Sequence, residues 1–301
     1  MKDKIFGVLQ RVGRSFMLPI ALLPVAGLLL GIGSSFTNET MLAAYGLNSV
    51  IHPGTLIYTI LDVMSQTGSA VFNNLALLFA MGVAIGMARK EKEVAALSGA
   101  VAYIIMNTAI QAMINAAGGV EAMPANSTTT MLGITTLQMG VFGGIILGCI
   151  AGWVFNKFGG KQFPIALSMF SGVRFPFLIM ICVSLGLGAL ACVAWPPVQG
   201  AIASVAGMIQ QSGNIGLFIY GALNKLLVPL GLHHLVYAPF QFSDMGGTLA
   251  LGETVIAGAY PIRVAEMGMP GVPFSDSTYY NAFAFNNLWP YLGIGAAFIF
   301  T

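Results

Sequence analysis

Residues 16–36 read FMLPIALLPVAGLLLGIGSSF, an apolar run that contains no charged side chain. A helix needs about 20 such residues to cross the hydrocarbon core of a membrane, so this run predicts a transmembrane helix. The whole chain agrees, because 57% of its 301 residues are hydrophobic and 7% are charged, whereas soluble domains carry about 25% charged residues. The sequence therefore predicts an integral membrane protein, and a net charge of +2 gives no reason to expect nucleic acid as a partner.

Four further apolar runs of similar length follow the first, at residues 70–88, 94–116, 134–155 and 174–195. The five runs together predict an all-α, polytopic membrane protein that begins with a five-span bundle. Between the first two runs, residues 41–65 are of intermediate polarity and predict a short interfacial helix. Asp62 lies in this stretch, and in a sharper interpretation it is an acid that lines a transport pathway.

Basic residues gather before the first predicted span and then at every second connection between spans. They precede the first span, separate the second from the third, and lie between the fourth and the fifth: Lys2, Lys4, Arg11, Arg14, Arg89, Lys90, Lys92, Lys157 and Lys161. Loops rich in Lys and Arg face the cytoplasm. The N-terminus is therefore expected on the cytoplasmic side.

Residues 224–240 read NKLLVPLGLHHLVYAPF and interrupt an apolar stretch that begins at Ile215. Pro229 and Gly231 weaken a helix there, and lipid does not satisfy the backbone groups that a break leaves free. Transporters build their substrate sites at such breaks. The pattern predicts a broken or re-entrant helix in a second domain that starts after Trp195.

The polar residues of this stretch are the candidate site. A neutral imidazole offers one donor and one acceptor, which suits a sugar hydroxyl. Because successive side chains on a helix diverge by about 100°, we expect one of His233 and His234 to face the substrate and the other to brace the backbone. Lys225, which follows Asn224, would hold a carboxylate, a phosphate or the last carbonyl groups of a helix.

Two further sets of residues are weaker candidates for functional sites. Arg174 begins the fifth apolar run and is either an interfacial anchor or a site residue. The cysteines, Cys149, Cys182 and Cys192, lie inside apolar runs, and no Cys/His cluster has metal-ligand spacing. We therefore expect neither a metal nor a cofactor.

The run GALNKLLVPLGLHHLVYAPF resembles the [EN]-R-x-L-x-P-x-G-L-H-H stretch of the IIC permeases of the bacterial phosphoenolpyruvate-dependent sugar phosphotransferase system, glucose superfamily. The early spans FMLPIALLPVAGLLLGIGSSF, LALLFAMGVAIGMARKEKEVAALSGAVAYIIMN and LGITTLQMGVFGGIILG are similar to those of the same superfamily. The run FSDMGGTLALGETVIAGA looks most like the maltose and α-glucoside branch. The similarity covers nearly the whole chain.

The resemblance implies that residues 1–195 form a dimerisation and scaffold domain and that residues 196–301 begin the sugar-binding transport domain, in a homodimer of the bacterial cytoplasmic membrane. It also implies that His233 and His234 bind the sugar beside Asn224 and Lys225, and that IIA and IIB components deliver the phosphoryl group. Two features depart from the family pattern. Lys225 replaces the usual arginine and loses its bidentate geometry, and the Gly-Ile-Thr-Glu motif is absent before Thr301, so we expect a C-terminally truncated chain.

The predicted function is a sugar permease that takes up glucose or an α-glucoside such as maltose. Phosphotransferase activity would arise only together with a IIB component. Two alternatives stay open. An ion-coupled secondary sugar transporter would need an acid beside the site, and residues 215–240 contain none; a membrane sugar sensor would bind sugar without transporting it.

Overall fold

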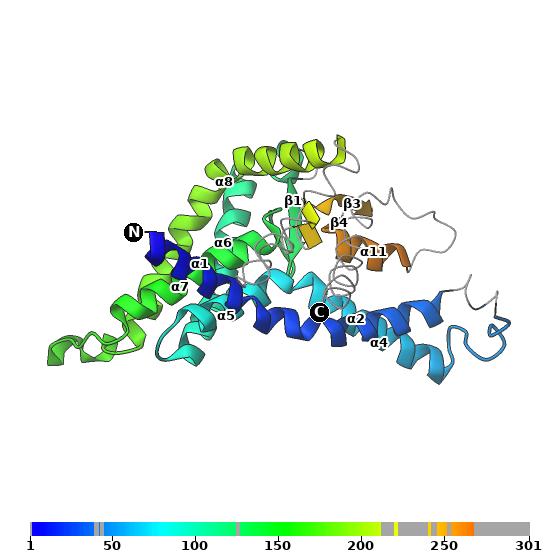
Figure 1. The fold of residues 1–301 in the computed structure, drawn as a ribbon, viewed down its shortest axis with the longest axis horizontal. Coiled ribbons are helices and arrows are strands. Elements are labelled where there is room, and N and C mark those ends of the chain that lie inside the picture. Colours follow the sequence, from blue (N-terminus) through cyan, green and yellow to red (C-terminus); the bar gives the residue numbers. More distant parts are fainter. Residues whose placement is uncertain are drawn as a thin grey trace, which may run out of the picture. The chain divides into compact units, whose positions relative to one another are not determined.

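The computed structural model describes residues 2–38, 42, 45–124, 127–211, 220–221, 240–241, 246–251 and 254–267 (Figure 1). Most of these residues are helical. The α-helices are α1 (Lys2–Ser15), α2 (Met17–Thr37), α4 (Leu56–Asn73), α5 (Leu75–Met87), α6 (Lys92–Ala116), α7 (Gly140–Phe158), α8 (Arg174–Gln211) and α11 (Ala259–Met267). The other elements are the 3-10 helices η1 (Val120–Ala122) and η2 (Ile165–Phe170) and the strands β1 (Thr128–Met131), β2 (Ile134–Leu137), β3 (Thr248–Leu251) and β4 (Thr254–Ala257).

Four helical segments are long and apolar enough to cross a membrane: Gln10–Thr37, Lys92–Ala116, Gly140–Phe158 and Arg174–Ala201. The pair α4 and α5 passes the same test jointly and gives up to five spans. The prediction of a polytopic helical membrane protein is confirmed.

The second predicted span, at residues 70–88, is wrong in its extent. The helical structure begins at Leu56, and α4 and α5 meet at Asn74 with a bend of 56°. The Asn74 side chain donates a hydrogen bond to the Ala70 carbonyl (2.8 Å), to which the Asn74 backbone also donates (3.2 Å). The regular backbone bond is thus kept, and the side chain shares its acceptor, an arrangement that often bends a helix. The predicted interfacial stretch at 41–65 therefore includes the first half of α4.

The fourth and fifth predicted spans also have different ends. Ile134 to Leu137 form strand β2, and α7 begins only at Gly140. The strand pairs with β1 through a two-residue turn in which Leu132 and Gly133 both have positive φ, 53° and 77°, the geometry that matches the twist of a hairpin. At the other end, α8 continues past Trp195 and through Pro196 and Pro197 to Gln211.

The chain divides into two compact units. The first comprises Met1–Pro24, Ala70–Gly200 and Ala250–Val255, and the second comprises Val25–Ser69, Ala201–Leu249 and Ile256–Thr301. In the first unit, α5, α6 and α7 pack against one another (Figure 1). The core between them includes Phe79, Val83, Ile110 and Leu147, which are fully buried.

Small residues bring α5 and α7 into close contact, as the spacing of Gly144, Gly148 and Gly152 predicts. A Cβ atom added at Gly148 would lie 2.6 Å from the Val83 Cβ and 2.8 Å from the Ala80 carbonyl oxygen, and one added at Gly144 would collide with the Ala76 carbonyl. Lipid tails are as apolar as leucine, so helices in a membrane associate through close van der Waals packing. These glycines therefore stabilise the first unit by letting the two backbones approach.

Buried polar contacts fix the β1–β2 hairpin onto the helices of this unit. The Thr136 hydroxyl donates to the Asn107 side-chain oxygen (2.8 Å), and the Asn107 amide donates to the Tyr103 carbonyl (2.8 Å). The Trp195 indole donates to the Gln138 carbonyl (3.0 Å), directly after β2. Because Asn107 and Thr136 are only 3% and 1% exposed, water does not replace these bonds.

Replacing Asn107 by alanine is expected to lower the free energy of unfolding by about 1–3 kcal/mol, because it leaves the Thr136 hydroxyl buried without its acceptor. Thermal unfolding in detergent measures the change. The double variant Asn107→Ala with Thr136→Val removes both partners and is expected to lose less than the sum of the two single variants. Additive losses would contradict the coupling.

The described helices of the second unit pack equally closely. A Cβ atom added at Gly68 of α4 would lie 2.6 Å from the Leu30 nitrogen and 2.7 Å from the Ala26 carbonyl oxygen of α2. Gly33 of α2 lies in the same way against Leu61 and Ser65 of α4. The α2 segment of this unit and α4 therefore form a tight helix pair.

Candidate functional site

The four leading site residues, Asn224, Lys225, His233 and His234, lie outside the described residues. The structure describes both flanks of their stretch, at Tyr220 and Gly221 on one side and at Phe240 and Gln241 on the other. The contacts of these flanking residues therefore provide the structural information next to the site.

The two flanks are in contact. The rings of Tyr220 and Phe240 meet edge to face, with 4.7 Å between their centroids and 67° between their planes. Tyr220 is buried, with 8% of its surface exposed. A buried edge-to-face pair contributes about 0.5–1.5 kcal/mol beyond its area. Two residues that flank the histidine stretch are thus held together by an aromatic contact.

Glycines allow close backbone contacts in the segment that follows Phe240. A Cβ atom added at Gly246 would collide with the Phe240 carbonyl and lie 2.6 Å from the Ala259 nitrogen at the start of α11. At the base of the β3–β4 hairpin, the Gly258 N–H donates to the Gly247 carbonyl (2.9 Å). Gly247 and Gly258 have φ values of 103° and 100°, which favour glycine. The run FSDMGGTLALGETVIAGA thus needs these glycines to bring Phe240 and α11 together.

Helix α11 carries a residue that sequence reasoning missed. Glu266 is only 6% exposed, and Ile262 on the same helix is 8% exposed. A buried carboxylate is costly unless it is paired, and Glu266 is a buried charged residue that the sequence analysis did not name. The available signal was Arg263, three positions earlier, because residues at that spacing are neighbours on a helix.

Helix α11 also packs against α2. A Cβ atom added at Gly27 of α2 would lie 2.5 Å from the Tyr260 hydroxyl oxygen. Gly27 therefore leaves room for the tyrosine, and the contact places α11 on α2 within the second unit.

Asp62 lies on α4 and has a partner on the same helix. The Gln66 side-chain amide donates to its carboxylate, with 2.7 Å between Nε2 and Oδ2. The carboxylate is half-buried and Gln66 is exposed. The structure thus gives Asp62 a neighbour that the sequence analysis did not name.

Arg174 is the first residue of α8, and its side chain is exposed. Its guanidinium donates to the Met169 carbonyl at the end of η2 (3.2 Å). The described contact of Arg174 is therefore with the loop before α8.

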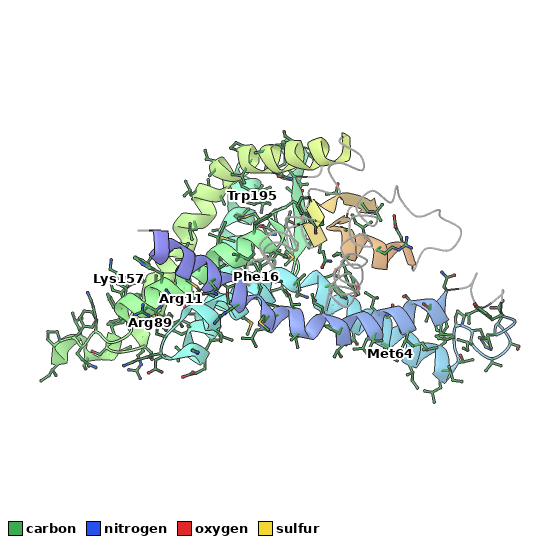
Figure 2. All side chains as sticks on the ribbon, in the orientation of Figure 1. Arg11, Phe16, Met64, Arg89, Lys157 and Trp195 are labelled. Atoms are coloured by element: carbon green, nitrogen blue, oxygen red, sulfur yellow. The ribbon has the colours of Figure 1, made fainter. Side chains whose placement is uncertain are left out.

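Among the basic residues of the first unit, Arg11, Arg89 and Lys157 lie toward the same side of the view in Figure 2. The Asn156 side chain of α7 accepts from the Arg89 backbone and donates to the Met87 carbonyl, both at 2.8 Å, which joins the C-terminal ends of α5 and α7. Lys157 lies 4.8 Å from the centre of the Trp153 ring, the range of a cation–π contact. Trp and Lys at a helix end are typical of a membrane interface.

A comparison with protein families gives one match over nearly the whole length. The model described as "Phosphotransferase system, EIIC" matches residues 13–299. This range includes the histidine stretch, α11 and every candidate span except the first three residues of Gln10–Thr37. The chain therefore belongs to the EIIC family of the phosphotransferase system.

Proposed function

We propose that this phosphotransferase-system sugar permease carries glucose or an α-glucoside such as maltose, which a IIB component phosphorylates. The family match over residues 13–299 carries the coarser part, a multi-pass sugar permease with phosphotransferase partners. The resemblance of FSDMGGTLALGETVIAGA to the maltose and α-glucoside branch supports the choice of sugar. Within that run, a side chain at Gly246 would collide with the Phe240 carbonyl, and the Gly258 N–H donates to the Gly247 carbonyl. These contacts explain why the run contains glycines.

The sugar site is proposed at His233 and His234, with Asn224 and Lys225 beside them. Imidazole and amide groups match the donors and acceptors of sugar hydroxyls. The contact between Tyr220 and Phe240 supports this proposal, because it ties both ends of the stretch to one buried point. Closing a segment at its ends reduces the conformations open to it, which lowers the entropy cost of binding.

The phosphoryl group is proposed to come from a IIB component that an IIA component recharges. All three cysteines of the chain lie in α7 or α8, both of which contain candidate spans. A cysteine that takes and passes on a phosphoryl group has to be accessible and to ionise. None of these cysteines lies in a polar segment, where a thiol is accessible to a protein partner and ionises readily.

The proposed architecture follows the expected division into residues 1–195, a scaffold that forms a homodimer, and residues 196–301, which belong to the transport domain. The N-terminus is proposed on the cytoplasmic side. Arg11, Arg89 and Lys157 lie toward one end of the first unit, which supports a single cytoplasmic face (Figure 2).

The proposal is tested by sugar phosphate formation in membranes that contain this chain. Membranes are mixed with the general phosphotransfer proteins, a IIA and a IIB component, phosphoenolpyruvate and labelled glucose or maltose. Labelled sugar phosphate is expected only when phosphoenolpyruvate and IIB are both present. The ratio of kcat/KM for the two sugars identifies the preferred one.

Membranes without the chain provide the background. Sugar that enters vesicles unphosphorylated, at the same rate with and without IIB, would contradict group translocation. Phosphorylation of neither sugar, while a β-glucoside is phosphorylated, would contradict the proposed sugar class and leave the family function intact.

A further inference from the structure

Helix α4 carries a stripe of polar side chains that the proposed sugar site does not include. Thr59, Asp62, Gln66 and Ser69 follow one another at intervals of three and four residues, which places them on one face of a helix. Thr59 and Gln66 are exposed, and Asp62 and Ser69 are half-buried. We call these four residues the α4 polar stripe.

The stripe is separate from the face of α4 that packs against α2. That face carries Leu61, Ser65 and Gly68, which lie against Gly33, Ala26 and Leu30. A third face carries exposed apolar side chains, with Ile57, Ile60 and Val63 at 47%, 53% and 57% exposure. The helix thus has a packing face, an apolar exposed face and a polar exposed face.

The apolar face is the one that lipid accommodates. A carboxylate that faces the centre of a bilayer costs at least about 2.5–3.5 kcal/mol, whereas the Thr59 hydroxyl donates to the Thr55 carbonyl within the helix (3.1 Å). Since α4 and α5 together have the length and apolarity of a span, the Asp62 carboxylate requires water or polar groups next to it. In a sugar permease, a water-filled path that contains the substrate supplies both.

The chemistry of the stripe matches a sugar. The bond from Gln66 Nε2 to Asp62 Oδ2 (2.7 Å) holds the amide and the carboxylate side by side. An ionised carboxylate accepts about four hydrogen bonds, and the Gln66 oxygen accepts further ones. The pair therefore presents a row of fixed acceptors to a ligand whose surface consists of hydroxyl donors, and the threonine hydroxyl at Thr59 extends it by one turn.

We propose that Thr59, Asp62 and Gln66 form a hydrated wall of the permeation path, where the Asp62 carboxylate and the Gln66 amide hydrogen-bond sugar hydroxyls. The inference rests on the sugar transport proposed above and adds a contact surface on α4. It assigns Asp62 a role in binding an uncharged polyol and none in binding a coupling ion.

Cysteine accessibility tests this wall without a phosphoryl donor. In a background where Cys149, Cys182 and Cys192 are replaced by alanine, single variants Thr59→Cys, Gln66→Cys, Ile60→Cys and Val63→Cys are treated with a charged thiol reagent. Thiols react as thiolates, which form in water and not in lipid. We expect Thr59→Cys and Gln66→Cys to react at least about tenfold faster than Ile60→Cys and Val63→Cys, and we expect glucose or maltose to slow only the first two.

A second readout uses otherwise unmodified chains. Asp62→Asn keeps the size of the side chain and removes its charge, and it is expected to raise the KM for the transported sugar about tenfold with little change in kcat. Val63→Leu, on the apolar face, is the matched control and is expected to leave both constants unchanged.

Each outcome decides the proposal. Equal, slow labelling at all four positions would overturn it, and cross-linking between copies at Gln66→Cys would identify a second copy as the neighbour of the stripe. Fast labelling that neither sugar slows would overturn the sugar contact. Because labelling is independent of phosphorylation, a failure of the sugar phosphate assay with protection intact would refute the proposed group translocation and leave the wall standing.

Discussion

Replacing His233 and His234 by alanine, one at a time, is expected to abolish sugar phosphorylation in one variant and only to destabilise the protein in the other. Side chains of adjacent helical residues point about 100° apart, so we expect one imidazole to face the sugar and the other to brace the backbone. Loss of a partner leaves a buried sugar hydroxyl unpaired, at a cost of about 1–3 kcal/mol. Sugar phosphate formation should fall at least about tenfold in the first variant, while the second loses thermal stability.

The third histidine supplies the control. His52 is exposed, and its ring Nδ1 lies 3.2 Å from the carbonyl oxygen of the adjacent Pro53. His52→Ala is therefore expected to change neither rate nor stability. Normal phosphorylation by both the His233→Ala and His234→Ala variants would show that the sugar site is elsewhere.

Replacing Gly144 by alanine is expected to be the most damaging single-methyl change in the first unit. The added Cβ would collide with the Ala76 carbonyl of α5 and lie 3.2 Å from the Ala80 nitrogen. The obstacle is backbone, which does not rotate away, so α5 and α7 have to separate. Overpacking of this kind costs about 1–3 kcal/mol, seen as a lower midpoint of thermal unfolding in detergent and as lost monodispersity.

The chain contains a matched control for this substitution. Gly186 lies in α8, and no described atom is within 4 Å of a Cβ built there. Gly186→Ala is expected to be neutral or to stabilise the helix by up to about 1 kcal/mol, because alanine has the higher helix propensity. Equal effects of the two substitutions would mean that contact between α5 and α7 does not limit stability.

The local features of the fold could be predicted from the sequence. A long uncharged run has one stable solution in lipid, a helix whose backbone groups bond within the segment, and the spans at residues 16–36 and 94–116 follow directly. The spacing of Gly144, Gly148 and Gly152 predicts a close helix contact by the same local logic. The histidine stretch indicated a sugar permease because it resembles the corresponding stretch of the IIC permeases.

The interruptions and pairings depended on tertiary structure. The span bends at Asn74, whose side chain shares the Ala70 carbonyl with its own backbone N–H, and asparagine alone does not predict that bond. Pro196 and Pro197 lie inside α8, where a sequence pattern favours an end, and Ile134 to Leu137 form a strand because β1 is there to pair with them.

The candidate site divides in the same way. Sequence alone selected the histidine stretch, whereas the contact of Tyr220 with Phe240, the burial of Glu266 and the pairing of Asp62 with Gln66 required coordinates. Composition and spacing determine which solvent a segment tolerates and which face of a helix a residue occupies. Which partner covers that face depends on residues far apart in the chain, because burial and hydrogen bonding are properties of the packed structure.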